Sequence, residues 1–217
     1  MSGPRVGVLS LQGDFACHRR MLEALGVEAV RVTLPRDLEG IDALILPGGE
    51  STTLTRLLEA TGLRDPLAAF VRERPVLGTC AGVILLGKGA ERLPAPPLGV
   101  LDVEVERNAY GRQIDSFSAE VEVAPLGRRM HGVFIRAPRL RSVGPDVEVI
   151  ARLVAAHGPA RISEPVGVRS GLRVGLCFHP ELTSDAGVHA WFLGEVAGLR
   201  LPAEVVATRR GPHGAGA

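Results

Sequence analysis

Apolar residues follow two different periodicities along the first half of this chain. Some form short continuous runs, which is the pattern of buried strands. Others recur every three or four residues, which is the pattern of a helix with one buried face. The runs predict strands at residues 5–11, 28–34, 41–49 and 74–80. The helical spacing predicts helices at residues 14–26, 51–62 and 81–89.

The ends of the predicted helices carry residues that suit those positions. Asp14 is placed to cap the start of the first helix, and Gly26 is placed to end it. The second helix begins with the hydroxyl groups of residues 51–53 and ends at Gly62. Capping chemistry therefore predicts the same boundaries as the periodicity.

Strands that alternate with helices predict a mostly parallel sheet with helices on both faces. We therefore expect a three-layer α/β fold of the flavodoxin-like or Rossmann-like kind. Ligands of such folds bind beyond the carboxyl ends of the strands. The most unusual stretches of the first half lie at those ends, namely "LQGD" (11–14), "PGGEST" (47–52) and "GTCAG" (78–82). Their shared position is stronger evidence for a site than any one of them.

The second half changes to short alternating strands separated by turns. These segments predict antiparallel strands beside the parallel sheet, at residues 98–111, 116–125, 131–138 and 147–169. One more buried strand is predicted at 172–182, followed by a closing helix at 185–199. Because no linker divides them, residues 1–201 are expected to form a single domain. Residues 202–217 lose apolar periodicity, so a disordered tail is expected there.

Composition narrows the class of protein. The formal net charge is only +1, so charge points neither to nucleic acid nor to an anionic membrane. No apolar run is long enough to span a bilayer, and no secretory leader is expected. The three cysteines are odd in number and widely spaced, so neither a disulfide framework nor a metal-binding pair is expected. These features predict a cytoplasmic protein with free thiols.

Cys80 lies between Gly78 and Gly82, where the fourth predicted strand meets a helix. The two glycines permit a tight strand-to-helix turn, which would push the cysteine out of the sheet towards the first amides of the helix. A helix N-terminus also stabilises a thiolate, which is the reactive form of the side chain. The alternative is a buried cysteine that only fills the core, and this stretch alone favours neither.

A nucleophilic cysteine needs a base, and His179 is the best candidate among the six histidines. It ends a predicted buried strand, and Pro180 favours extended geometry at the residue before it. Residues i and i+2 of an extended chain share a face, so Glu181 would orient the imidazole. Together these features predict a Cys80–His179–Glu181 triad. His131 is left open, and solvent-facing roles are expected for His18, His157, His189 and His213.

Acyl transfer also requires hydrogen-bond donors for an oxyanion. The Gly48-Gly49 turn offers bare backbone at the same edge of the sheet, and the amides of Gly49 and Ala81 are the expected donors. A plain turn followed by a helix that Ser51 caps would have the same sequence. The phosphate-binding motifs G-x-G-x-x-G and G-K-[ST] are absent. No metal is expected, because no aspartate is spaced with histidines as ligands usually are; this holds for Asp14, Asp42 and Asp115.

These motifs resemble a known family. "GTCAG" with a distant "HPE" is similar to the class I glutamine amidotransferases. The resemblance narrows to the glutaminase subunits of pyridoxal 5′-phosphate synthase through five further stretches, at 11–14, 46–52, 106–117, 132–138 and 178–182. It extends over about residues 6–199. The motifs "GRQ…SF" and "FIRAP" distinguish this family from other glutaminases.

The resemblance implies hydrolysis of L-glutamine to glutamate and ammonia. It implies that Cys80 is the nucleophile and that His179 and Glu181 complete the triad. Arg107 would pair with the α-carboxylate of glutamine. The full set of implied substrate contacts is Gly49, Glu50, Ser51, Arg107, Ile135 and Arg136. Without the resemblance, both arginines would be taken for solvated surface charges.

The resemblance also implies a partner, a barrel-shaped synthase subunit that receives the ammonia, and neither a metal nor an organic cofactor. Gln12 lies at a neighbouring strand end, where docking of that partner would fix the Gly48-Gly49 peptide. Cys177 replaces a frequent serine, and it is expected near His179 without a catalytic role. Two other classes stay open: a different Cys–His hydrolase on this fold, such as a γ-glutamyl peptidase, and a non-catalytic regulatory relative.

Overall fold

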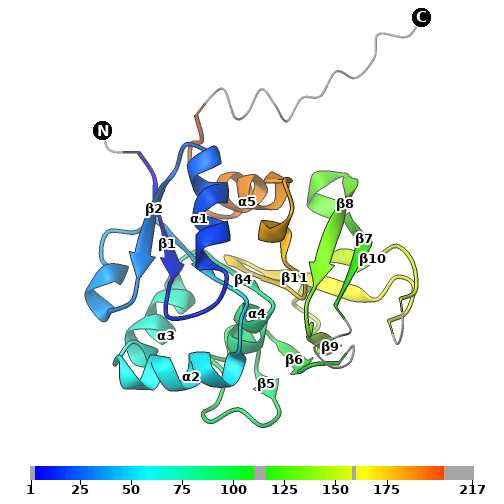
Figure 1. Cartoon of the computed structure of the whole chain (residues 1–217), viewed down its shortest axis with the longest axis horizontal. Coiled ribbons are helices and arrows are strands. Elements are labelled where there is room, and N and C mark those ends of the chain that lie inside the picture. The colour runs from blue at the N-terminus through cyan, green and yellow to red at the C-terminus, as the bar shows by residue number, and fades with distance from the viewer. Residues whose placement is uncertain (1–2, 110–115, 158–159, 203–217) are drawn as a thin grey trace, which may run out of the picture.

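A mixed nine-stranded sheet runs through the molecule (Figure 1). The computed structural model describes residues 3–109, 116–157 and 160–202. Five neighbouring strands are parallel, in the spatial order β2 (Glu28–Val32), β1 (Arg5–Leu9), β3 (Ala43–Leu46), β4 (Val76–Thr79) and β12 (Arg173–Leu176). The sheet continues with antiparallel pairing through β11 (Pro165–Ser170), β10 (Glu148–Leu153), β7 (Phe117–Val123) and β8 (Arg128–Phe134). A second sheet contains β5 (Gly89–Ala90), β6 (Val103–Glu106) and β9 (Arg139–Val143).

Helices cover both faces of the parallel strands. In Figure 1, α1 (Phe15–Ala24) and α5 (Gly187–Trp191) lie above the sheet. Below it lie α2 (Ser51–Ala60), α3 (Arg64–Glu73) and α4 (Ala81–Leu86). The predicted three-layer α/β fold, parallel in its first part with antiparallel strands added, is therefore confirmed. Among the described residues, no helix has the length and apolarity that crossing a membrane requires.

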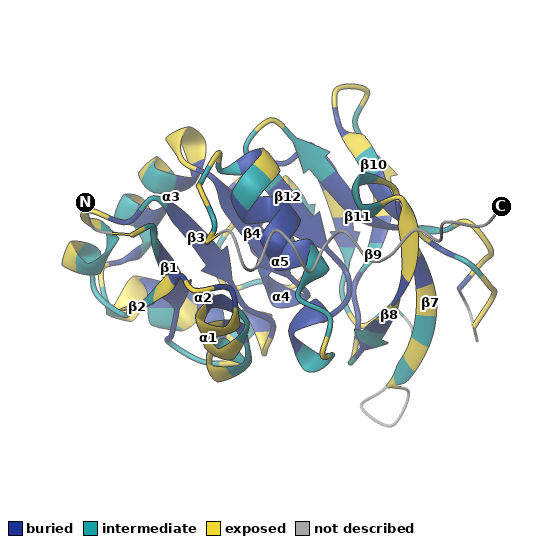
Figure 2. Cartoon of the chain, turned by 90° about the horizontal axis from the view of Figure 1, so that it is seen from above, coloured by how far each residue is buried: buried dark blue, intermediate teal, exposed yellow. Residues whose placement is uncertain are grey.

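The core follows the layers of the fold. Every residue of β3 and β4 is buried, because helices cover both faces of these strands. Along β7, in contrast, buried and exposed positions largely alternate towards its end. Figure 2 shows this difference as a dark blue centre around β3 and β4 and a lighter β7 at one side. The continuous apolar runs and the alternating runs of the sequence therefore correspond to different parts of one sheet.

Several element boundaries differ from the sequence-based expectation. Helix α3 was not predicted; only Leu67 and Val71 are buried along it, and Pro66 is tolerated because it lies in the first turn. The predicted closing helix is shorter, since α5 passes into a π-helical turn at Phe192–Val196. Two expected features lie outside the described residues: almost all of the predicted tail, at 203–217, and the centre of the 106–117 motif, at 110–115.

Candidate active site

Cys80 occupies a sharp turn between β4 and α4. Its φ angle is +49°, a conformation that costs a residue other than glycine about 1–3 kcal/mol. Neighbouring glycines allow this turn to pack tightly. A β-carbon on Gly82 would collide with the carbonyl oxygen of Leu46, and one on Gly78 would lie 2.6 Å from the carbonyl carbon of Gly82. The glycine spacing therefore produces the strained turn that it predicted.

The thiol of Cys80 is less exposed than the sequence suggested. The residue is only 5% exposed, although a nucleophile on such a turn was expected to project outwards. Its Sγ lies 3.8 Å from the carbonyl oxygen of Ile135, on the loop that follows β8. Both residues line one pocket, so the thiol is sheltered by this loop and still reaches a cavity.

His179 lies near Cys80 because β4 and β12 are neighbours in the sheet. Thr79 pairs with Leu176, so the residues after both strands leave the sheet at the same edge. The backbone N–H of His179 donates a hydrogen bond to the carbonyl of Val133, with an N···O distance of 2.8 Å. The imidazole then lines the same pocket as Cys80.

Glu181 holds the imidazole of His179. Its Oε1 lies 2.7 Å from Nδ1, and the residue is only 3% exposed. The local reason differs from the expectation, because Pro180–Leu182 form a 3₁₀ helix instead of continuing the extended chain. The turn folds the carboxylate back onto the ring. The predicted pairing is therefore present with a different backbone geometry.

These contacts shift the pKa values of both groups. Burial lowers the pKa of His179, but its interactions with Cys80 and Glu181 outweigh burial and raise that pKa to about 10. Burial raises the pKa of Glu181, but His18 and His179 outweigh it and hold that pKa well below its usual range. Nε2 of His179 has no hydrogen-bond partner among the described residues. Cys80 therefore raises the pKa of the imidazole through its proximity, without a hydrogen bond of ordinary geometry. The site favours an imidazolium beside a carboxylate.

Cys177 and His131 are both placed away from the pocket lining. Cys177 is fully buried; burial and the charge at Cys80 raise the pKa of Cys177 far above its ordinary value. A buried neutral thiol is a poor nucleophile, in line with the expectation that Cys177 is not catalytic. His131, which the sequence left open, is exposed on β8.

A pocket of about 170 Å³ gathers most of the residues that the sequence analysis selected. They are Gly49, Glu50, Ser51, Cys80, Arg107, Ile135, Arg136 and His179. Ala81 begins α4 beside it, and Glu181 and Gln12 lie behind the lining residues. Asp14, Ile84 and Asn108 also line the pocket, although the sequence predicts no substrate contact for them.

Each of these three residues carried a signal. Asp14 ends the strand-end stretch "LQGD"; the sequence predicts it as a helix cap and not as a metal ligand, but its side chain makes no capping hydrogen bond. Ile84 lies one helical turn after Cys80, so it shares a face with the start of α4. Asn108 has a φ angle of +50°, which asparagine tolerates better than most residues. The strand-end position of "LQGD" already points to Asp14, and helical spacing identifies Ile84.

Arg107 directly follows β6, and its guanidinium is fixed rather than solvated. Nη1 donates to the carbonyl oxygen of Arg92 at 2.8 Å, and Nη2 donates to Oγ1 of Thr52 at 2.9 Å. Nη2 also lies 3.5 Å from the carboxylate of Glu50, and the side chain is 16% exposed. A positive charge held in this way at a pocket wall is prepared to receive a carboxylate.

Glu50 caps α2, where a hydroxyl group was expected. Its carboxylate accepts hydrogen bonds from the backbone N–H groups of Thr52 and Thr53, at 3.0 and 2.6 Å. Burial by itself would raise the pKa of Glu50, but the hydrogen bonds from Thr53 and Thr52 outweigh burial and lower that pKa to about 2. The longer side chain takes the capping role because the extended backbone of Glu50 lets its carboxylate reach both amides. Ser51 is the first residue of the helix instead.

Gln12 contacts the turn that precedes α2. Its Oε1 accepts a hydrogen bond from the backbone N–H of Glu50, at 3.0 Å. Gly49 has a φ angle of +144°, and a β-carbon there would lie 2.5 Å from Oε1 of Gln12. The side chain of Gln12 therefore lies directly against the Gly49 backbone, at the peptide that the sequence analysis linked to partner docking.

Two histidines that were expected to face solvent are buried. His18 and His189 are both 0% exposed. Nε2 of His18 lies 3.2 Å from Oε1 of Glu181, and Nδ1 of His18 lies 2.9 Å from Nε2 of His189. The expectation was wrong because His18 is on the buried stripe of α1, with Leu22 and Leu25 at positions i+4 and i+7.

Asp14, His179 and Glu181 offer ligand atoms that lie within 4.8 Å of one another, although their sequence spacing predicted no such set. Nδ1 of His179 lies 2.7 Å from Glu181 and 3.9 Å from Asp14. A proton shared with Glu181 occupies the lone pair on Nδ1 that a metal would need. The arrangement therefore suits an oriented imidazole better than a metal ion.

Fold and site together define a glutamine amidotransferase, an enzyme that releases ammonia from glutamine. The chain belongs to the SNO glutamine amidotransferase family, whose sequence profile matches residues 8–198. A solved structure described as a glutamine amidotransferase is 48% identical and has a TM-score of 0.80, covering 89% of this chain and 99% of its own.

Two relatives carry a more specific name. The pyridoxal 5′-phosphate synthase subunit PdxT of Thermus thermophilus is 49% identical over 197 residues, which are 89% of this chain and 98% of that protein. The subunit of the same name from Thermosipho africanus is 43% identical over 193 residues, which are 88% of this chain and 98% of that protein.

Proposed function

We propose that this protein hydrolyses the side-chain amide of L-glutamine for pyridoxal 5′-phosphate synthesis, with Cys80 as the nucleophile. The observation that carries the assignment of roles is the oriented imidazole: Glu181 holds His179 at 2.7 Å, beside Cys80 at the pocket. Membership of a glutamine amidotransferase family supports the reaction class. The name shared by relatives that are 43% and 49% identical supports the pathway.

In this proposal the thiolate of Cys80 attacks the amide carbon, and the carbonyl electrons move to the oxygen. The backbone N–H groups of Gly49 and Ala81 stabilise that oxyanion. When the oxyanion collapses, the C–N bond breaks and His179 protonates the leaving ammonia. His179 then takes a proton from water as the water attacks the thioester, which releases glutamate and regenerates the thiolate. Each step uses only groups of the chain and water, so the reaction requires neither a metal nor an organic cofactor.

The pocket offers complementary groups for a free amino acid. The guanidinium of Arg107 would bind the α-carboxylate, because it is fixed at the wall and carries the opposite charge. Glu50, or backbone carbonyls such as that of Ile135, would receive the α-ammonium. Ser51 and Arg136, which line the same pocket, complete the proposed set of contacts. A γ-glutamyl peptide would have to place a second residue against these same walls.

The partner in this proposal is the barrel-shaped synthase subunit, to which the ammonia is delivered. Docking would fix the peptide at Gly49 through Gln12, whose side chain already contacts that backbone. The isolated chain would then have little activity. We place the reaction in the cytoplasm, which is supported by three cysteines that are all free.

The test is a glutaminase assay of the purified chain, titrated with the purified synthase subunit, for wild type and for Cys80→Ala. The proposal expects glutamine hydrolysis that the partner increases, and no hydrolysis by the variant. A parallel assay with γ-glutamyl peptides separates the alternative hydrolase. Hydrolysis of peptides but not of glutamine, or turnover by Cys80→Ala, would contradict the proposal.

A further inference from the structure

Glu181 contacts two imidazoles instead of one. Its Oε1 lies 2.7 Å from Nδ1 of His179, and 3.2 Å from Nε2 of His18. Oγ1 of Thr79 is a third neighbour, at 3.4 Å from the same oxygen. The side chains of Glu181 and His18 are both 0% exposed, so no bulk water competes for these contacts. The oxygen that orients His179 is therefore also held by His18 and Thr79.

The contacts continue beyond His18 to another helix. Nδ1 of His18 lies 2.9 Å from Nε2 of His189. His18 belongs to α1 and His189 to α5, the two helices that cover one face of the sheet (Figure 1). Thr79 ends β4, directly before Cys80. Groups from four elements thus meet behind the pocket, since Glu181 belongs to the 3₁₀ helix Pro180–Leu182, and His18, His189 and Glu181 are absent from the pocket lining.

The donors and acceptors of these contacts can be assigned along the series of side chains. Nε2 of His18 lies 3.2 Å from Oγ1 of Thr79, its hydrogen-bond partner, and 3.2 Å from Oε1 of Glu181. The Thr79 hydroxyl donates in turn to Oε1 of Glu181, so Thr79 accepts from His18 and Nε2 of His18 carries the proton. Burial, assisted by His18, lowers the pKa of His189 to about 3, so His189 is neutral and has a single N–H group. Nδ1 of His189 has no partner among the described residues, so placing the hydrogen on Nε2 leaves no buried donor unpaired. His189 then donates to His18, and the N–H of His18 donates to Thr79 beside the carboxylate of Glu181.

We propose that His18 is a positioning residue, which fixes the carboxylate of Glu181 so that Oε1 stays on Nδ1 of His179. The inference rests on the proposed glutaminase function and adds a residue that does not touch substrate. Oε2 of Glu181 makes no hydrogen bond among the described residues, so both imidazoles act on the one oxygen. Without His18, the carboxylate would keep only the contacts of its Oε1 with His179 and Thr79, and Thr79 would lose its own hydrogen bond with His18. The orientation of Glu181 would then be less well defined.

A matched pair of variants tests which nitrogen of His18 matters. The amide NH₂ of His18→Gln reaches about the position of Nε2 and can still donate to Glu181. That of His18→Asn reaches about the position of Nδ1, on the side of His189. We expect His18→Asn to lose about 10- to 100-fold in kcat, with an unchanged KM for glutamine, as second-layer substitutions do. His18→Gln should retain most of the wild-type kcat, and the exposed control His131→Asn should retain all of it.

The glutaminase assay is run with the synthase subunit present, and thermal unfolding of each variant is recorded. A purely structural role would make kcat follow stability, not the position of the amide. Equal turnover by His18→Gln and His18→Asn, or a change in KM alone, would overturn the inference.

A second readout keeps the test independent of the proposed function. The rate at which iodoacetamide alkylates Cys80 is measured by mass spectrometry at neutral pH, without glutamine. We expect slower alkylation in His18→Asn than in wild type, His18→Gln and His131→Asn, because a poorly oriented His179 stabilises less thiolate. Lack of glutaminase activity in the wild type would refute the proposed function alone. Identical alkylation rates in the two His18 variants would refute the role of His18.

Discussion

Gly48 lies against the imidazole of His179, so closely that a β-carbon at position 48 would overlap Cε1 of the ring. The same β-carbon would come within 2.9 Å of Nδ1, the atom that contacts Glu181. The backbone that follows β3 therefore packs against His179, which follows β12. A methyl group at this position must displace either the ring or the turn.

Gly48→Ala should therefore lower kcat strongly, because His179 is pushed away from Glu181 and Cys80. Steady-state glutaminase kinetics with the synthase subunit measure this effect. Gly194→Ala is the matched control, since a β-carbon at Gly194 meets no atom within 4 Å. The control should keep wild-type kinetics and unfold at an equal or higher temperature, because alanine restricts the unfolded chain. Wild-type kcat in Gly48→Ala would show that the close packing of residue 48 against His179 is not needed.

Cys80→Gly should lose less stability than Cys80→Ala. The φ angle of +49° strains any residue that has a β-carbon, and glycine removes strain on the order of 1–3 kcal/mol. The greater freedom of glycine in the unfolded state offsets about 0.5–1 kcal/mol of this gain. Both variants should lack glutaminase activity. Thermal unfolding of the two proteins decides the matter, and a higher melting temperature for Cys80→Ala would contradict the strain argument.

A diazo-ketone analogue of glutamine should label Cys80 alone. Cys177 is fully buried with its pKa raised by burial, so it stays protonated and inaccessible. Cys17 is partly exposed on α1 and does not line the pocket. Peptide mapping by mass spectrometry identifies the modified residue. Labelling that persists in Cys80→Ala would place the nucleophile elsewhere.

The alkaline side of the pH–activity profile should report on His179. Its pKa is raised to about 10, so the imidazolium persists through neutral pH and is lost as the pH rises through that value. Glu181→Gln removes the negative charge that supports the imidazolium, so the alkaline limb should move to lower pH and kcat should fall. Profiles of kcat and of kcat/KM for glutamine against pH measure the two effects. Glu120→Gln, on the exposed side of β7, is the control and should leave the profile unchanged.

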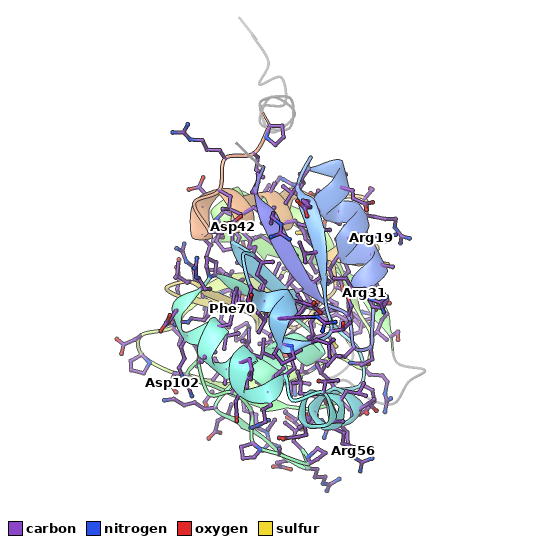
Figure 3. All side chains as sticks on the ribbon, turned by 90° about the vertical axis from the view of Figure 1, so that its left-hand side faces the viewer. Arg19, Arg31, Asp42, Arg56, Phe70 and Asp102 are labelled. Carbon is purple, nitrogen blue, oxygen red and sulfur yellow. The ribbon has the colours of Figure 1, made fainter. Side chains whose placement is uncertain are left out.

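Arg107→Ala should raise the KM for glutamine about 10- to 100-fold, because a charge-assisted hydrogen bond contributes about 1.5–3 kcal/mol. Arg56→Ala is the control: Arg56 lies on the exposed side of α2, where Figure 3 labels it at the edge of the molecule. Initial rates over a range of glutamine concentrations separate KM from kcat. An unchanged KM in Arg107→Ala would mean that another group binds the α-carboxylate.

The sequence by itself determined which segments are strands and helices in the parallel half of the fold. Apolar runs and helical stripes specify local structure, because a strand or helix must bury its apolar face whatever lies opposite. The strained turn at Cys80 was also readable, since Gly78 and Gly82 are the residues that allow it. Helix α3 was missed because few of its residues are buried, which left a weak stripe.

Only the tertiary structure decided which of these segments meet. Periodicity shows that a face is buried but not what covers it, so nothing local places β12 beside β4, or His179 beside Cys80. His18 and His189 show the same limit: each lies on a buried helix face, yet their contact depends on two helices packing over the same side of the sheet. Long-range pairing of strands and helices, which no short stretch encodes, therefore assembled the buried half of the site.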